Sequence, residues 1–338
     1  MKEDLSKKSY AVSKEDLLFD KLNQIIRSNQ RFVITTHQLP DGDGLGGEIA
    51  LASYLKAIGK ECHMINSDPT PEKFSLVDPD SEIQVWDDKG TLPKTDVIFA
   101  LDVNEIKRVG ALYAPLEKLK ARVVYIDHHI SDEELRGEHI IDHEISSMGE
   151  FLFRFFRYVH AEITFKMALA MYVSIFLDTH RFRHRRTTAL SHAIAAALVD
   201  LGVNPAMVHQ KVHQTRSLNE MHLLGEVLKG VQTSQDGKIA WVSVSLEMQK
   251  KFNSSPEESQ GFVDHLLNLK DVEIAVLFRE EAKDRVRVSF RSKGGVEIYP
   301  LVKKLGGGGH AYEAGVLLTD SIEHAVEQVL KQIEYLTR

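Results

Sequence analysis

The chain has very little cysteine and no long apolar run. Cys62 is the one cysteine among 338 residues, so no disulfide within the chain and no cysteine-based zinc cluster can form. No segment approaches the roughly 18 uninterrupted apolar residues of a membrane span, and the charged amino terminus lacks the apolar stretch of a signal peptide. These absences predict a cytoplasmic protein that spans no membrane.

Positive charge is also scarce. Lysine and arginine number 42 against 49 aspartates and glutamates, which gives a formal net charge of -7. Proteins that coat long nucleic acids depend on a basic footprint, so this balance argues against a long duplex or long strand as the ligand. A short or small phosphorylated substrate remains compatible with it. The content of 43% apolar and 27% charged residues is that of a globular protein.

The order of apolar patterns predicts an α/β fold with two domains. Helical spacing covers 14–29 and 45–58, and short β-type runs at 32–36, 62–65, 97–101 and 123–126 predict a parallel sheet. Further helices are expected at about 147–160, 187–201, 204–214 and 218–228. After Gly230 the pattern changes to strands at 239–244, 273–278, 285–290 and 315–318, with helices near 296–305 and from 321. We therefore expect a catalytic domain at 1–215, a helical linker at 216–235 and a smaller α+β domain at 236–338, with the active site in the cleft between the two domains.

Acids and imidazoles follow the predicted strands directly. Carboxyl ends of parallel strands share one edge of a sheet, where ligands bind. The run 171–177 also ends in an aspartate, which we expect to be placed in the same way. The candidate residues are His37, Asp41, Asp43, Asp102, Asp127, His128, His129 and Asp178.

Four of these carboxylates, gathered with two neutral imidazoles, carry about four negative charges, which need compensating cations. Two divalent ions would balance that sum. Oxygen and imidazole ligands without thiolate suit Mn²⁺ or Mg²⁺, and Zn²⁺, Co²⁺ or iron also fit. We expect two Mn²⁺ ions.

The spacing of these residues resembles the successive motifs of the DHH phosphoesterases. The matching stretches are His37-x-x-Pro-Asp41-x-Asp43, Asp102, Asp127-His128-His129 and Asp178. Near the end of the chain, Gly307-Gly308-Gly309-His310 resembles the glycine motif of the DHH-associated C-terminal domain, and 289–292 resembles the strand before it. The combination resembles the nanoRNase and pAp phosphatase branch of this superfamily.

The resemblance implies a ligand set for each ion. One ion would be held by His37, Asp41 and a bridging Asp102, and the other by Asp43, Asp102, His128 and Asp178. Besides Asp102, the catalytic residues would be His129 and Asp127. His129 would contact the scissile phosphate or assist the leaving oxygen. The alternative is that His129 contacts a metal-binding side chain and not the substrate. Asp127 would orient a neighbouring imidazole.

Candidate substrate contacts lie mainly near the end of the chain. The backbone of Gly307, Gly308 and Gly309 can approach a phosphate, with His310, Arg291 and Ser289 adding polar groups. The alternative is structural, since Gly306 also fits a helix C-cap.

Two further features concern basic residues. Arg108 resembles the arginine that often follows the second motif, and an exposed residue at a helix start is the alternative. His180 stands where relatives commonly have glycine, and it opens a basic run at 180–186. The His180 imidazole would narrow the metal pocket or contact phosphate, and the basic run adds local positive charge. The alternative is that these side chains face solvent or an acidic neighbour, so substrate preference depends on this run.

The expected activity is hydrolysis of very short 5′-phosphorylated oligoribonucleotides to mononucleotides, with removal of the 3′-phosphate from 3′-phosphoadenosine 5′-phosphate (pAp). One alternative is a phosphodiesterase for cyclic or linear signalling dinucleotides. Another, from a different class, is a catalytically silent nucleotide-binding regulator. The expected partners are short RNA and small nucleotides, with no long duplex and no membrane, and a homodimer is allowed for.

Overall fold

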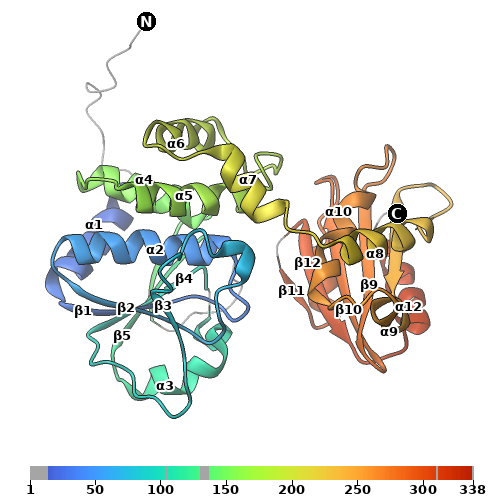
Figure 1. Ribbon diagram of the computed structural model, residues 1–338, viewed down its shortest axis with the longest axis horizontal. Helices are drawn as coiled ribbons and strands as arrows, with labels where there is room; N and C mark the ends of the chain where they lie inside the picture. Colours follow the sequence, from blue (N-terminus) through green and yellow to red (C-terminus); the bar gives the residue numbers. More distant parts are fainter. Residues whose placement is uncertain (1–13, 104, 130–136, 310, 337–338) are drawn as a thin grey trace, which may run out of the picture. The chain divides into compact units, whose positions relative to one another are not determined.

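The computed structural model describes residues 14–103, 105–129, 137–309 and 311–336. By its internal contacts the chain separates into two compact units, 1–214 and 215–338, each with its own sheet (Figure 1). The predicted fold class is confirmed: the first unit is built on a parallel sheet, and the second is a smaller α+β unit.

Unit 1 contains a six-stranded sheet in the order β3-β2-β1-β4-β5-β6, and all neighbouring strands are parallel. The chain runs outward from β1 to β3 and then returns to place β4 against the other side of β1. The ends of β1 and β4 therefore flank the switch point of the sheet, where open α/β sheets bind ligands. The strands are β1 Arg31–Thr35, β2 Glu61–Asn66, β3 Ile83–Val85, β4 Val97–Leu101, β5 Arg122–Asp127 and β6 Glu138–Ile141.

Helices cover both faces of this sheet (Figure 1). Phe32 and Ile34 of β1 pack in the core beneath α2, α4 and α5, whereas Val33 packs in the core formed with η2 and α3. This alternation is the two-residue period of a strand that is buried on both faces. The elements are α1 Lys14–Ser28, α2 Gly42–Ala57, η1 Glu72–Phe74, η2 Ile106–Leu112, α3 Tyr113–Lys118, α4 Met148–Tyr158, α5 Phe165–Asp178, α6 Ala189–Asp200 and α7 Pro205–His213.

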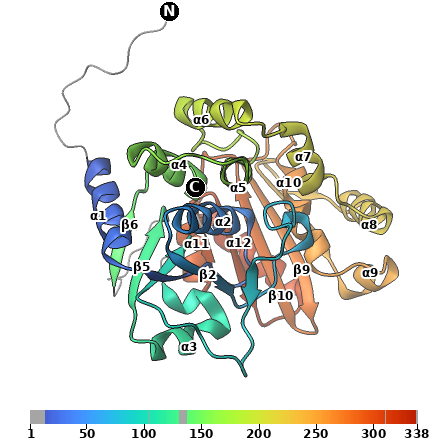
Figure 2. The same cartoon turned by 60° about the vertical axis from the view of Figure 1, so that its left-hand side comes forward.

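One edge of the sheet in unit 1 is covered by a helix. Helix α1 lies beside the edge strand β6 (Figure 2), where the Lys21 ammonium donates to the His139 carbonyl.

Among the described helices, none is long and apolar enough by itself to cross a membrane. The pair α6 and α7 satisfies that criterion only when taken together, with a bend of 105° between them.

Asp178 ends a helix, so the expectation that it follows a strand-like run is wrong. The run 171–177 is the C-terminal half of α5, whose side chains there are mostly buried. A helix buried on most sides loses its polar stripe, and a short apolar run then has no visible period. Helix α5 also packs closely on α2, since a Cβ at Gly46 would lie 2.5 Å from the Ala170 carbonyl oxygen. This close approach brings Asp178 to the same end of the sheet as Asp43.

Unit 2 has a six-stranded sheet in the order β11-β12-β10-β9-β8-β7, in which only β8 and β9 pair in parallel. Its strands are β7 Gln232–Thr233, β8 Ile239–Val244, β9 Ile274–Ala282, β10 Arg285–Ser292, β11 Gly308–Gly309 and β12 Glu313–Leu318. Its helices are α8 Leu218–Lys229, α9 Leu246–Lys251, η3 Glu257–Phe262, α10 Val263–Leu266, α11 Tyr299–Lys304 and α12 Ile322–Leu336.

Both faces of the second sheet carry an apolar core. Helices α11 and α12 pack on one face, over side chains such as Val288 and Phe290. The other face packs against α8, η3 and α10. The stretch 216–235, predicted as a linker, contains α8, and Leu223, Leu224 and Val227 of α8 are buried in this second core. Burial of three apolar side chains makes α8 part of unit 2.

Candidate metal centre

The first ligand group lies in the turn between β1 and α2. Asp41 is the N-cap of α2, and its Oδ1 accepts from the backbone N of Asp43 at 2.9 Å and of Gly44 at 3.2 Å. The ring of His37 has its Nδ1 2.8 Å from the Gln38 carbonyl oxygen, which can only accept, so Nδ1 carries the proton. His37 Nε2 therefore faces the carboxylates, and this atom lies 3.7 Å from Asp41 Oδ2. A backbone carbonyl behind the ring is the usual support of a metal-binding histidine.

Asp102 lies at the centre of the site. It follows β4 directly with φ 56°, a left-handed conformation, and its side chain is nearly fully buried. One carboxylate oxygen, Oδ2, is 3.5 Å from His37 Nε2. The other, Oδ1, is 3.6 Å from His128 Nε2 and 3.2 Å from His129 Nδ1. Asp102 therefore faces ligand candidates on both sides, as a bridging carboxylate would.

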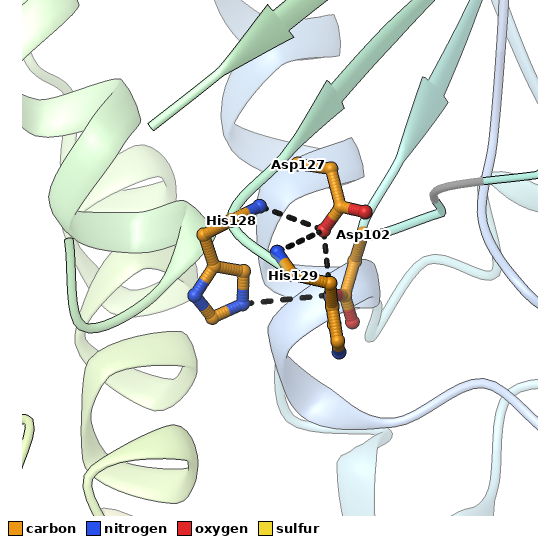
Figure 3. A group of neighbouring side chains, drawn as sticks. All are labelled: Asp102, Asp127, His128 and His129. Carbon is orange, nitrogen blue, oxygen red and sulfur yellow. Dashed lines mark hydrogen bonds and ion pairs between the residues drawn. The ribbon is translucent and has the colours of Figure 1, made fainter. Parts of the chain in front are cut away.

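Asp127 closes the turn after β5 (Figure 3). Its Oδ1 accepts from the backbone N of His128 at 2.7 Å and of His129 at 3.1 Å, and it lies 2.6 Å from His129 Nδ1. This one oxygen thus fixes both the backbone of the motif and the ring of His129. In Figure 3 the other ring nitrogen of His129 points away from Asp127.

His128 brings a third set of carboxylates together. Its buried Nε2 is 3.3 Å from Asp43 Oδ2 and 3.7 Å from Asp178 Oδ2. Asp43 is itself held in place, because its Oδ1 accepts from the Met148 backbone N at 3.0 Å and from the Ser174 hydroxyl. Ser174 was not identified from the sequence, since a serine within a buried helix carries no distinctive signal.

The donor atoms form three overlapping groups, each with all atoms within 4.8 Å of one another. These groups are His37, Asp41 and Asp102; Asp43, His128 and Asp178; and Asp102, Asp127, His128 and His129. The structure thus brings together all eight residues that the sequence proposed for the metal centre and its catalytic neighbours.

The electrostatics of the site favour added cations. Burial, together with the neighbouring Asp43 and Asp102, raises the pKa of Asp178 to about 7. Burial opposes charge on the ring of His37, but the Asp102 and Asp41 carboxylates outweigh it and raise its pKa to about 11. Within the described ranges, Oδ1 of Asp102 and Oδ2 of Asp178 are buried without a hydrogen-bond partner. Oxygen and nitrogen donors with unsatisfied carboxylate atoms fit divalent ions.

Two neighbours of the centre had no assigned role in the sequence reasoning. Arg186 places Nη1 3.1 Å from His128 Nδ1 and 3.9 Å from Asp178 Oδ2, whereas the sequence marks it only as one of the basic residues at 180–186. Behind His37, the Asn66 amide donates to Glu48 Oε2 at 2.7 Å and accepts from the Thr36 backbone N at 3.1 Å. The available signal for Glu48 is a charged residue within the apolar stretch of α2.

The predicted substrate contacts are distributed over both units. Arg108 lies beside the first ligand group, since its carbonyl accepts from the Gln38 backbone N at 2.7 Å, and its side chain is exposed. In unit 2, Arg291 of β10 is ion-paired to Asp264 at 3.4 Å and to Glu313. Ser289 lies two residues earlier on the same strand. His310 lies outside the described residues, and the predicted cleft between the units stays a prediction.

The glycine run is part of the second sheet. Gly308 and Gly309 form β11 and pair with Gly315 and Ala314 of β12. A Cβ at Gly307 would lie 2.4 Å from the Gly315 carbonyl oxygen, and one at Gly309 would lie 2.5 Å from Ala314 Cα, so both glycines permit close strand contact. A Cβ at Gly308 would have no atom within 4 Å, so the described fold gives no steric reason for glycine there.

Comparisons with protein families account for both units. The family model described as DHH family, N-terminal domain, matches residues 31–175, and the DHHA1 domain matches 236–338. A parallel α/β unit with an aspartate and histidine centre at its switch point, followed by such a domain, defines the class. The chain belongs to the DHH family of metal-dependent phosphoesterases.

Named relatives match along most of their length. A protein of Thermus thermophilus named bifunctional oligoribonuclease and PAP phosphatase NrnA is 30% identical over 90% of each chain. A Bacillus subtilis protein of the same name is 26% identical over 90% of this chain and 94% of that protein. Among solved structures, an exopolyphosphatase-related protein from Bacteroides fragilis is 26% identical, with a TM-score of 0.87 over 97% of this chain and 98% of that chain.

Proposed function

We propose that this protein hydrolyses very short 5′-phosphorylated oligoribonucleotides to mononucleotides and removes the 3′-phosphate of pAp to give AMP. The observation that carries the proposal is the position of Asp102 between two groups of ligand candidates, which fits a two-ion phosphoesterase. The names of the Thermus and Bacillus relatives support the choice of substrates.

Each ion has a set of protein ligands in this proposal. His37, Asp41 and Asp102 would hold one ion, and Asp43, Asp102, His128 and Asp178 the other. When bound, two divalent ions activate the attacking water and stabilise the attacking and leaving oxygens of an in-line displacement. Mn²⁺ is the ion we propose, because the donors are carboxylate and imidazole without thiolate.

His129 and Asp127 act next to the ligands. Burial opposes the charged ring of His129, but Asp102 and Asp127 outweigh it and raise its pKa to about 9. Asp127 holds the Nδ1 side of this ring, so the opposite nitrogen is the atom that can contact the scissile phosphate or donate a proton to the leaving oxygen. Arg108, next to the first ligand group, is a further candidate for a phosphate contact.

Unit 2 binds the terminal phosphate in this proposal. Gly308 provides a backbone N–H on a strand that has no side chain at that position and no neighbouring atom within 4 Å of the Cβ site. Arg291 and Ser289 of β10 add a guanidinium and a hydroxyl, and His310 is the remaining predicted contact. A contact of this kind favours substrates that carry a terminal phosphate over those that lack one.

Product analysis with manganese tests the proposal. Purified protein is incubated separately with a 5′-phosphorylated diribonucleotide, pAp, a 20-mer RNA, a cyclic dinucleotide and pyrophosphate. We expect mononucleotides from the dinucleotide, AMP from pAp and little attack on the other three. Asp178→Ala should be inactive, and Asp200→Ala, an exposed aspartate on α6, is the matched control. Inactivity on both the dinucleotide and pAp would refute the substrate assignment.

A further inference from the structure

The loop after α5 has an unusual backbone. We call residues 180–186 (His-Arg-Phe-Arg-His-Arg-Arg) the basic loop. His180, Arg181 and Phe182 have φ values of 49°, 66° and 62°, so three successive residues with side chains are left-handed. This conformation costs free energy at each L-residue, and such residues concentrate at ligand clamps. A sharp reversal of this kind needs specific contacts to hold it.

Thr179 and Phe182 supply those contacts. The Thr179 hydroxyl accepts from the Phe182 backbone N at 3.0 Å, and the Thr179 carbonyl accepts from the N of Arg183 and His184 at 2.9 Å. The ring of Phe182 stacks on His192 with centroids 5.0 Å apart, and it lies 6.3 Å from the ring of Phe176. Phe182 thus anchors the part of the loop that carries Arg181 and Arg183.

Basic residues from other elements surround the same place. His213 of α7 has its ring centroid 5.5 Å from those of Phe176 and His209. Its Nε2 is buried and makes no hydrogen bond to any described residue. Burial lowers the pKa of His213 to about 4, and the charged groups that reinforce this most are Arg181, His209, Lys73 and Arg183. Arg181, Lys73 and Arg183 carry positive charge, so the local potential is positive in a chain whose net charge is -7.

The loop is connected to the metal centre at both ends. It begins two residues after the ligand candidate Asp178, and its last residue, Arg186, reaches His128 Nδ1 at 3.1 Å. The loop therefore offers positive charge along a segment that starts and ends at the metal centre. A phosphodiester strand supplies anions at regular intervals, and arginine and lysine are its usual partners.

We propose that the basic loop, with Lys73 and His213, binds the phosphodiester group that follows the scissile one in an oligoribonucleotide. This inference rests on the proposed function and adds a second phosphate site to it. In a 5′-phosphorylated dinucleotide the single phosphodiester is the scissile one, so no further phosphodiester follows it. A trinucleotide is the shortest substrate that reaches the basic loop, so the loop increases the preference for three or more nucleotides over two.

The test compares chain lengths in charge-matched variants. In Arg181→Gln/Arg183→Gln, the ratio of kcat/KM for the trinucleotide to that for the dinucleotide should fall about tenfold, as expected for loss of charged hydrogen bonds. Arg157→Gln/Arg285→Gln removes two exposed arginines elsewhere and should leave the ratio unchanged. Arg181→Lys/Arg183→Lys should restore most of the ratio, which a purely structural role of the arginines would not produce. An unchanged ratio in the Gln/Gln variant overturns the inference.

A binding measurement separates this inference from the proposed activity. Fluorescence anisotropy of a 3′-labelled, 5′-phosphorylated phosphorothioate trinucleotide with manganese reports affinity without turnover. Each lost phosphate contact should reduce the salt dependence of log affinity by about 0.7. If the wild type fails to cleave the dinucleotide but the Gln/Gln variant still loses trinucleotide affinity, the proposed activity fails and the phosphate site stands. Equal affinity and salt slope in the two proteins refute the site whatever the activity.

Discussion

Glu48 gives a prediction about stability and pH. Its side chain is buried in α2, and its Oε1 has no hydrogen-bond partner among the described residues. Burial raises its pKa from 4.5 to about 8, although the hydrogen bond from Asn66 partly opposes the rise. Below pH 4.5 both folded and unfolded states hold the proton. Between pH 4.5 and 8 the unfolded state ionises first, so this group lowers stability as pH rises.

The size of the effect follows from the two pKa values. At about 1.4 kcal/mol per pH unit, moving this pKa from 4.5 to about 8 lowers the free energy of unfolding by on the order of 5 kcal/mol above pH 8. Glu48→Gln removes the titration, and its carbonyl can still accept from the Asn66 amide. The stability of the variant relative to wild type should therefore increase with pH. If the new amide N–H in Glu48→Gln lacks a partner, it would lower the free energy of unfolding of this variant by about 1 to 3 kcal/mol at every pH. The quantity to compare is therefore how the stability difference between Glu48→Gln and wild type changes with pH.

Urea unfolding in EDTA at pH 5, 6, 7, 8 and 9 measures this difference. Trp86 lies in unit 1 and Trp241 in unit 2, so a Trp241→Phe background makes fluorescence report on unit 1. The control is Glu150→Gln, because Glu150 Oε2 accepts from the hydroxyls of Ser146 and Ser191, and its loss should destabilise the protein. A stability difference between Glu48→Gln and wild type that is the same at pH 5 and pH 9 would refute the reasoning.

Three shorter predictions concern the site and its turn. Asp102→Ala should lose both ions, since Asp102 faces His37 and His128; two tightly bound Mn²⁺ by calorimetry would contradict the bridging role. Gly308→Ala should retain its melting temperature but raise KM for the dinucleotide, because the added methyl meets no protein atom within 4 Å; unchanged KM would remove Gly308 from the phosphate site. Leu39→Asn should raise stability by about 1 kcal/mol in urea unfolding, since Leu39 has φ 54° and is 77% exposed, and a loss would show that its side chain contributes contacts.

The ligand positions could be predicted from the sequence because they follow strands. Asp102 comes directly after a fully apolar strand, and His128 comes directly after a strand that ends in Asp127. Parallel strands place such residues at one edge whatever the details of packing. Strands β3 and β6 were not predicted, because they have three and four residues and too few apolar side chains to show a period.

The sequence by itself determined which residues carry the chemistry, since motif spacing and strand ends are local properties of the chain. Tertiary structure alone decided how distant residues meet: α5 packs on α2 and brings Asp178 to His128, and Arg186 reaches the same ring. It also decided that Glu48 is buried beside Asn66 behind the first ligand group. The three side-chain contacts join residues 18 to 58 positions apart, and α2 and α5 are more than 100 residues apart. No local pattern encodes such contacts, because they depend on helix packing and on burial in a common core.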